Sequence, residues 1–370
     1  MATGKSISDI RVGVVGFGLA GRVFHAPFVS AVPGLRLTAI VQRTGDDAAK
    51  AYPAATVYRS IEDLLKSDVD LVVIATPNRA HVPMAKQALL AGKHVVVDKP
   101  MAGTWEGAKE ITALAKESTL LLSPFHCSRW HGDFATLKSV VNASTLGRLV
   151  TIEAKMDRYR PIPRVSTWKE IESDENGILM DLGPHMVDQA MALLGRPSTV
   201  TASVRADREG SRIADAFDLT LEFQREEARV LFRLQASLIA AATGPRFVAH
   251  GVNGSFVKTG IDGQQAAVTA NPHVPSIDDQ PEWIREDEAF WGELILAPNP
   301  AEPAVLERSR IPTLVRDYRG YYRNIRDALR GDAALHVTPK DGCRVIRLLE
   351  LALQSSRERR TINVTDSDWE

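Results

Sequence analysis

The sequence is poor in cysteine and lacks any long hydrophobic run, and each shortage excludes a class of protein. Only Cys127 and Cys343 occur in 370 residues, and their separation matches no metal-binding spacing. Neither a disulfide framework nor a metal site is therefore expected. No apolar stretch reaches the length of a membrane span, and the polar N-terminus has no apolar signal-peptide core. We expect a cytoplasmic protein without a membrane-embedded part.

An excess of charge of one sign is also absent. The 45 lysines and arginines are balanced by 46 acidic residues, which leaves a formal net charge of −1. General binding to nucleic acid or to a membrane surface needs a basic footprint, so neither partner is expected. The length suits two domains, and a hydrophobic content of 44% with 25% charged residues is ordinary for a globular protein.

The first thirty residues contain the pattern of a dinucleotide-binding turn. An apolar run at 10–15 leads into Gly16-Phe17-Gly18-Leu19-Ala20-Gly21, and a segment with helical periodicity follows. In such a turn the first glycine allows a tight bend, the second lets a pyrophosphate approach, and the third lets helix pack on strand. The helix N-terminus then offers N–H groups to the phosphates. Pro27 predicts a distorted first turn at His25-Ala26 before the regular helix.

Strands and helices alternate regularly up to about residue 123. The sequence predicts buried strands at 35–41, 70–76, 94–97 and 120–122, with helices at 62–67, 83–91 and 105–116. Such alternation indicates right-handed crossovers and a parallel sheet. We therefore expect an α/β Rossmann-type domain over residues 1–125.

From about residue 147 the hydrophobic pattern changes to a period of two. The alternation at 150–157 and 217–223 is typical of antiparallel strands with one packed face. Helices are predicted at 178–194, 321–329 and 341–357, whereas 270–312 is predicted to be loop with one hairpin near 290–296. Residues 126–370 are expected to form an α+β domain, whose terminal helix packs back toward the first domain.

The end of the second predicted strand bears on the choice of cofactor. A site that prefers NAD places Asp or Glu there to hold the ribose hydroxyls, whereas this chain has Gln42, Arg43 and Thr44. A guanidinium suits a 2′-phosphate, so NADP(H) is expected over NAD(H), with Arg43 as the phosphate partner. Asp46 and Asp47 lie just beyond and leave this count open.

Two groups of residues suggest acid–base and alkoxide chemistry. Lys99 lies between a buried strand and Pro100, at a sheet edge where its ammonium could stabilise an alkoxide, and the Lys-Pro bond is a candidate for the cis form. Asp181 and His185 are four residues apart and share one face of a helix. A carboxylate beside an imidazole orients it and raises its basicity. A capping Asp with a core His fits the spacing equally well.

Taken together, these motifs resemble the Gfo/Idh/MocA oxidoreductase family over nearly the whole chain. The resemblance rests on the glycine turn with Val23-Phe24-His25-Ala26-Pro27, on Thr76-Pro77-Asn78-x-x-His81, on Asp98-Lys99-Pro100 and on Asp181-Leu-Gly-Pro-His185-x-x-Asp188. Within the family the chain is most similar to the NADP-dependent scyllo-inositol dehydrogenases. That likeness rests on His126-x-x-Arg129-Trp130, Asp157-Arg158-Tyr159-Arg160-Pro161 and Gly244-Pro245-Arg246.

The resemblance implies a Rossmann domain followed by a large open, mainly antiparallel sheet, through which a homodimer or homotetramer forms. It implies hydride transfer between NADP(H) and a ring hydroxyl or ketone of a cyclic polyol or sugar, with Lys99, Asp181 and His185 as the catalytic set. Expected cofactor contacts are Gly16, Phe17, Gly18, Leu19, Ala20, Gly21, Arg43, Thr76, Pro77, Asn78, His81, Lys99 and Pro100. Expected substrate contacts are His126, Arg129, Trp130, Arg158 and Tyr159.

Several segments depart from the family pattern and leave the substrate open. Cys127-Ser128 stands where relatives tend to carry Asn and Arg, Thr167-Trp168-Lys169 is less arginine-rich, and 270–312 is longer. Three other functions stay open. They are a dinucleotide-binding regulator that has lost catalysis, a glycoside-cleaving enzyme with a tightly held NAD, and a reductase of another sugar ketone.

Overall fold

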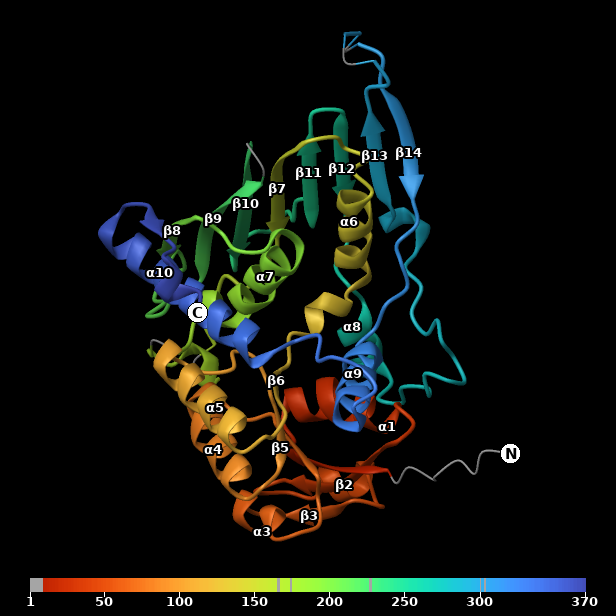
Figure 1. The fold of residues 1–370 in the computed structure, drawn as a ribbon, viewed down its shortest axis with the longest axis vertical. Coiled ribbons are helices and arrows are strands. Elements are labelled where there is room, and N and C mark those ends of the chain that lie inside the picture. The colour runs from red at the N-terminus through yellow and green to blue at the C-terminus, as the bar shows by residue number, and fades with distance from the viewer. Residues whose placement is uncertain (1–8, 165–166, 174, 226–227, 300, 303) are drawn as a thin grey trace.

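The computed structural model describes residues 9–164, 167–173, 175–225, 228–299, 301–302 and 304–370. The polar N-terminal residues 1–8, on which the absence of a signal peptide was predicted, lie outside the described part. Two β-sheets dominate the chain and lie toward opposite ends of it (Figure 1). Helices α7, Ile178–Leu194, and α10, Pro339–Glu358, lie between them.

The first sheet is parallel, and within the described residues its strand order is β3-β2-β1-β4-β5-β6. Its strands are β1 Ile10–Val15, β2 Leu35–Val41, β3 Thr56–Tyr58, β4 Leu71–Ile74, β5 His94–Val97 and β6 Leu122–Pro124. This order confirms the Rossmann-type α/β class. The direction of strand addition reverses between β1 and β4, so the ligand crevice lies beyond their carboxyl ends. The short, incompletely buried β3 was not predicted.

The helices beside this sheet are α1 Ala26–Ser30, α2 Asp47–Ala51, α3 Ile61–Leu65, α4 His81–Leu90 and α5 Trp105–Glu117. The distortion predicted ahead of Pro27 is present and longer than expected, because a π-helical segment spans Ala20–His25. Pro27 then lies in the first turn of α1, where its missing N–H costs no hydrogen bond.

The second sheet is mixed and mostly antiparallel, with the order β14-β13-β12-β11-β7-β10-β9-β8-β15 in the described part of the chain. Its strands are β7 Leu149–Lys155, β8 Thr199–Arg205, β9 Ala216–Arg225, β10 Ala228–Ser237, β11 Phe247–Gly251, β12 Gly254–Lys258, β13 Gly292–Leu296, β14 Glu307–Ile311 and β15 Ile362–Asn363. The β7–β10 pair is parallel, and the other pairs are antiparallel. The α+β class of this half is thus confirmed. The span 290–296, predicted as a hairpin, contains the single strand β13, which pairs with β14 further along the chain.

Helices cover one face of this sheet and join it to the first. The remaining helices are α6 Gly132–Asn142, α8 Gln264–Ala270 and α9 Arg319–Arg330. Apolar residues of α7 and α10 pack against the buried faces of β7, β9 and β10. Helix α10 also packs on α5, where Glu350 accepts a 2.8 Å hydrogen bond from the Trp105 N–H. Helix α6 was not predicted, because Thr136, Val140 and Val141 are β-branched and weaken a helical signal. No helix in the described ranges is long and apolar enough to cross a membrane.

Candidate functional site

The glycine turn after β1 has the shape that a dinucleotide needs. Gly16 has φ +102°, and a Cβ there would lie 2.5 Å from the Ala75 carbonyl oxygen. A Cβ at Gly21 would lie 1.9 Å from the carbonyl oxygen of Gly16, so only glycine lets this segment approach the strand. A Cβ at Gly18 would meet nothing within 4 Å. The exposed middle of the turn is therefore open to a pyrophosphate, and the turn fits the group.

The loop after β2 presents two arginines. Arg43 is exposed and forms no ion pair within the described residues, whereas Asp46 pairs with Lys50 at 3.1 Å. Arg59, which follows β3, donates from Nη1 to the carbonyls of Gln42 at 2.9 Å and Gly45 at 2.6 Å. Within the described residues its other guanidinium nitrogens make no hydrogen bond or ion pair. Sequence reasoning missed Arg59 because β3 was not recognised as the next strand.

Asp47, the second acid near the end of β2, also has a partner within the chain. Asp47 accepts a hydrogen bond from the Gln42 side chain at 3.3 Å, and the Gln42 oxygen accepts the Ala48 N–H at 2.8 Å. Gln42 thus ties the start of α2 to the end of β2. Both acids that left the cofactor count open have a partner beside α2, and both are exposed, as Arg43 is.

His81 joins the loops that follow β4 and β5. One ring nitrogen lies 2.7 Å from the carbonyl oxygen of Pro100, and the other lies 2.9 Å from that of Thr76. The ring is 1% exposed, so it supports these loops and is not accessible to a dinucleotide. The predicted cofactor contact at His81 is corrected accordingly. The Lys99-Pro100 peptide bond between the two loops is cis.

The other predicted residues of the β4 loop lie at the crevice. Thr76, Pro77 and Asn78 are all partly exposed. The Thr76 hydroxyl oxygen is buried and has no hydrogen-bond partner in the part of the chain that the structure describes. A buried polar atom without a partner is uncommon in proteins and indicates a place for a ligand or water. Asn78 instead donates to the backbone carbonyl of Glu175 at 2.7 Å.

Lys99 and Asp181 come together at the centre of the site. The Lys99 ammonium donates to Asp181 Oδ1 at 2.9 Å and to the Asp181 backbone carbonyl at 2.6 Å. Lys169 donates to the same Oδ1 at 2.8 Å, and Arg158 lies 3.6 Å from Oδ2. Burial acts to raise the pKa of the Asp181 carboxyl, but Lys99, Lys169 and Arg158 hold that pKa well below its usual value. The carboxylate is therefore ionised at neutral pH.

His185 lies one helical turn after Asp181 but differs from the expectation. Among the described residues no hydrogen bond joins it to Asp181, and its buried Nδ1 has no partner. Burial lowers the pKa of His185 well below 6.5, and the nearby cation of Lys99 lowers it further, with Asp181 opposing weakly. Asp181 thus acts to raise the pKa of His185, as predicted, but burial and the neighbouring cation outweigh it, and in the described ranges no hydrogen bond orients the ring through Asp181. The imidazole is neutral at neutral pH and has a free nitrogen.

The segment after β6 separates into two environments. His126 is 1% exposed, neither of its ring nitrogens has a partner in the described ranges, and burial lowers its pKa. Arg129 donates to both oxygens of the buried Asp188, at 2.8 and 2.7 Å, and to the His336 carbonyl at 2.6 Å. Trp130 packs edge-on against Tyr321 at 5.5 Å.

These contacts give two of the predicted substrate residues structural partners. Arg129 and Trp130 make an ion pair and a ring contact within the chain and are partly exposed, so their substrate contacts stay predictions. Tyr159 has a 61% exposed side chain, and its neighbour Arg158 faces Asp181. His126 is as buried as His81, but both of its ring nitrogens lack a partner in the described ranges, so its substrate contact stays a prediction.

Asp98 is a site residue that the sequence analysis did not select. Its carboxylate accepts the Lys99 backbone N–H at 2.8 Å, and His25 Nε2 lies 3.8 Å from the same oxygen. The other nitrogen of His25 lies 2.6 Å from the Tyr322 hydroxyl. Burial acts to raise the pKa of Asp98, but His25 and Lys99 hold it below its usual value. The segment after the glycine turn is thereby connected to the backbone of Lys99.

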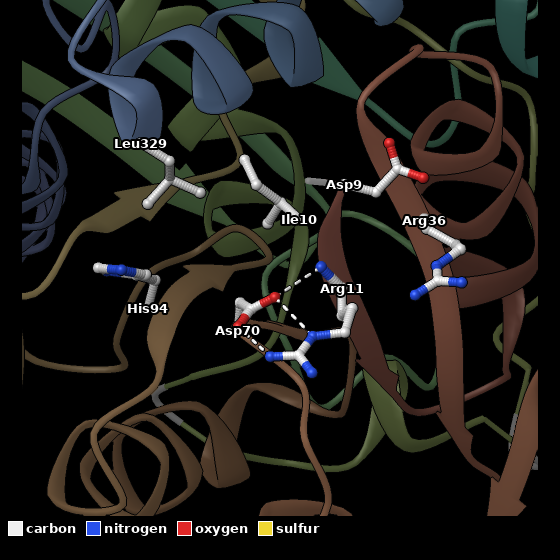
Figure 2. Close-up of a pocket in the computed structure, with 7 residues that line it drawn as sticks. All are labelled: Asp9, Ile10, Arg11, Arg36, Asp70, His94 and Leu329. Carbon is white, nitrogen blue, oxygen red and sulfur yellow. Dashed lines mark hydrogen bonds and ion pairs between the residues drawn. The ribbon is translucent and has the colours of Figure 1, made fainter. Parts of the chain in front are cut away.

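An open cavity of about 630 Å³ borders the amino ends of strands in the parallel sheet (Figure 2). It is lined by Asp9, Ile10, Arg11, Arg36, Asp70, His94 and Leu329. Arg11 donates to both oxygens of Asp70, at 2.9 and 2.7 Å, so these charges satisfy each other. Ligands of open parallel sheets bind beyond the carboxyl ends of the strands, whereas this cavity borders the amino ends. It is therefore not the candidate active site.

Comparison with known proteins agrees with this architecture. The family model described as "Oxidoreductase family, NAD-binding Rossmann fold" matches residues 10–126, and that described as "Oxidoreductase family, C-terminal alpha/beta domain" matches residues 138–364. The chain is 35% identical to scyllo-inositol 2-dehydrogenase (NADP(+)) IolW of Bacillus subtilis, over 97% of each chain. It is 37% identical to the uncharacterised oxidoreductase YdgJ of Escherichia coli, covering 96% of this chain and 98% of that one. The structure of the oxidoreductase yvaA from Bacillus subtilis superposes with a TM-score of 0.90 at 34% identity, covering 98% of this chain and 100% of that one.

The fold and these relatives show that the protein is an oxidoreductase with an NAD-binding Rossmann fold, related to inositol and sugar dehydrogenases. The chain belongs to the Gfo/Idh/MocA oxidoreductase family.

Proposed function

We propose that the protein transfers a hydride between NADP(H) and a ring carbon of a cyclic polyol or sugar, interconverting a hydroxyl and a ketone. The observation that carries this proposal is the Lys99–Asp181 ion pair with a neutral His185 one turn away. An ammonium and a neutral imidazole are the groups that alcohol oxidation needs, since one stabilises an alkoxide and the other accepts a proton.

In this mechanism each residue has one task. The nicotinamide ring, when bound, supplies the hydride acceptor for oxidation and the donor for reduction. In oxidation His185 accepts the hydroxyl proton, and in reduction it returns that proton. Lys99 stabilises the oxyanion through its ammonium, and Asp181 holds that ammonium in the site through their 2.9 Å ion pair.

The preference for NADP(H) is supported by the loop after β2. Arg43 is exposed there, Arg59 lies against the same loop, and Asp46 and Asp47 have partners beside α2, in Lys50 and Gln42 respectively. Guanidinium groups bind phosphate through paired hydrogen bonds. The relative IolW, named as NADP-dependent, agrees with this preference. The predicted contacts at Gly16–Gly21, Thr76, Pro77, Asn78, Lys99 and Pro100 belong to the proposed cofactor site.

The remaining predictions are carried forward as parts of this proposal. The domain boundary lies near residue 125, just after β6 ends at Pro124. The chain forms a homodimer or homotetramer through the second sheet, of which the helices α7 and α10 cover one face. A cytoplasmic location is supported by two free, buried thiols, Cys127 and Cys343.

A steady-state screen tests the function. Inositols, inososes, aldoses and other sugar ketones are offered with NADP(H) and with NAD(H), and the wild type is compared with His185→Gln. Turnover of a cyclic polyol or its ketone that is lost in His185→Gln supports the proposal. Cofactor binding without turnover of any substrate would favour the regulator, and NAD retained through purification would favour the glycoside-cleaving enzyme.

A further inference from the structure

We propose that Lys169 is a positioning residue that compensates the charge of Asp181 when Lys99 leaves that carboxylate to stabilise the substrate oxyanion. The inference rests on the proposed function, because it assigns Lys169 a task in the same catalytic step. Lys169 acts through Asp181 and is not itself placed on the reacting atoms.

The two lysines share one acceptor. Lys99 and Lys169 donate to the same Asp181 Oδ1, at 2.9 and 2.8 Å, from two different elements. Lys99 comes from the end of the parallel sheet, and its side chain is 15% exposed. Lys169 comes from a short 3₁₀ helix, Trp168–Glu170, and its side chain is 43% exposed. The carboxylate thus has one inner and one outer ammonium.

The segment that carries Lys169 is fixed in place at several points. Asn176 donates to the carbonyls of Trp168 at 3.0 Å and Ile171 at 2.9 Å. Glu170 pairs with Arg208 at 3.1 Å, and the Arg208 side chain is fully buried. These contacts fix the backbone that carries Lys169. Its side chain therefore starts from a fixed position near Asp181, unlike that of a lysine on an unanchored surface loop.

The same segment also reaches the loop after β4. The carbonyl of Glu175 accepts the Asn78 side-chain N–H at 2.7 Å, and Asn78 belongs to the proposed cofactor site. The turn that holds Lys169 therefore spans from the β4 loop to the start of α7. The segment thus contacts both the β4 loop, through Asn78, and α7, through Lys169 and Asp181.

Charge balance supplies the reason for a second lysine. A largely buried carboxylate that loses its cation is strongly destabilised, because nothing replaces the lost hydration. If Lys99 were the only partner of Asp181, its move toward an oxyanion would leave that carboxylate unpaired. Lys169 keeps the pair satisfied, so Lys99 can change partners. Arg158, at 3.6 Å from Oδ2, is too distant to form the same hydrogen bond.

Several charged or titratable groups face Asp181 besides Lys169. They are Lys99 from the β5 end, Arg158 and Arg160 from the segment after β7, and His185 from α7 itself. The three cations closest to the carboxylate all favour its ionised form. Removal of Lys169 therefore shifts the ionisation of Asp181 to higher pH and leaves the other groups in place.

The test compares Lys169→Met with Lys169→Arg, which keeps the charge and the hydrogen bond. Lys66→Met is the matched control, because Lys66 pairs with Asp63 at 2.9 Å on the surface. With NADP⁺ and a responsive polyol, Lys169→Met is expected to lower kcat by about tenfold or more, with KM for NADP⁺ unchanged. The acid limb of the kcat profile moves to higher pH, and Lys169→Arg restores both rate and profile.

A second measurement needs no turnover. The ¹³C resonance of the Asp181 carboxyl, assigned with Asp181→Asn, is titrated in the full-length protein for the wild type, Lys169→Met and Lys66→Met. The midpoint is expected to rise in Lys169→Met alone. An unchanged midpoint, or a fall in kcat that is equal at every pH and not rescued by arginine, overturns the proposal. A wild type that turns over no polyol defeats the proposed function, whereas this titration still tests the link between Lys169 and Asp181.

Discussion

Lys99 binds Asp181 at two points, the carboxylate at 2.9 Å and the backbone carbonyl at 2.6 Å. The contact joins the carboxyl end of β5 to the first turn of α7. One ion pair thus connects the parallel sheet to a helix that packs on the second sheet. Because the carbonyl bond is independent of the carboxylate, Lys99 keeps one anchor on α7 if its ammonium turns from Oδ1 toward substrate.

Replacement of Lys99 tests the oxyanion role. Lys99→Met is expected to lower kcat by about 100- to 1,000-fold, the usual effect of removing one oxyanion donor. Binding of NADPH, followed by fluorescence titration, is expected to weaken much less than kcat falls, because Lys99 is one of several proposed cofactor contacts and the glycine turn is untouched. A kcat that stays near that of the wild type would remove Lys99 from catalysis. Lys66→Met, at the surface, serves as the control.

The depressed pKa of His185 predicts different pH dependences for oxidation and for reduction. Its pKa lies well below 6.5, so the neutral form that accepts a proton persists as the pH falls through 6.5. The rate of oxidation is therefore expected to show no acid limb centred on that value. Reduction needs the protonated imidazole, so its kcat rises as the pH falls. Initial rates in both directions between about pH 6 and 8 check this. An oxidation limb at 6.5 would contradict the assignment.

Arg43 and Arg59 are expected to distinguish the two cofactors. Arg43→Ala and Arg59→Ala each weaken NADPH by about tenfold or more and leave NADH nearly unchanged, since only NADPH carries the 2′-phosphate. Fluorescence titration of both cofactors measures the ratio. Arg36→Ala is the control. Arg36 is an exposed arginine near the amino end of β2, whereas Arg43 follows the carboxyl end of that strand (Figure 2). Equal losses for both cofactors would remove these arginines from phosphate binding.

The fold was predictable from the sequence where its signals are local. Buried strands such as Leu71–Ile74 and the glycine turn are specified by consecutive residues. The parallel direction of the strands follows from the alternation of strands and helices. The elements that were missed have weak local signals. The strand Thr56–Tyr58 is only three residues long, and α6 contains β-branched residues. Their structures depend on the neighbours against which they pack.

The site was predictable in composition but only partly in its pairings. The choice of Lys99, Asp181 and His185 came from motifs, whereas the contact from Lys169 to Asp181 depends on an irregular segment with no periodic signal. The spacing of Asp181 and His185 suggested a pair because residues four apart share a helix face. Two lysines from other elements take the carboxylate instead. For a similar reason the sequence did not reveal the partner of Arg129, since Asp188 lies on a different helix, α7.

The Arg129–Asp188 pair provides a final prediction, on stability. Asp188 is fully buried, and Arg129 donates to both of its oxygens, so Arg129→Met would leave a buried carboxylate without its cation. Breaking a buried pair in this way costs about 3–5 kcal/mol in the free energy of unfolding. The double variant Arg129→Met/Asp188→Leu is expected to recover most of that loss, because no unpaired charge remains.

Urea unfolding of the single and double variants measures these changes, and the exposed pair Lys66–Asp63 provides the comparison. Exposed ion pairs contribute about 0–1 kcal/mol, so Lys66→Met should leave the midpoint nearly unchanged. Substrate KM discriminates the two roles of Arg129. If Arg129→Met kept its stability but raised the substrate KM, the arginine would be a substrate ligand after all. We expect the reverse, because its donors are already used by Asp188 and the His336 carbonyl.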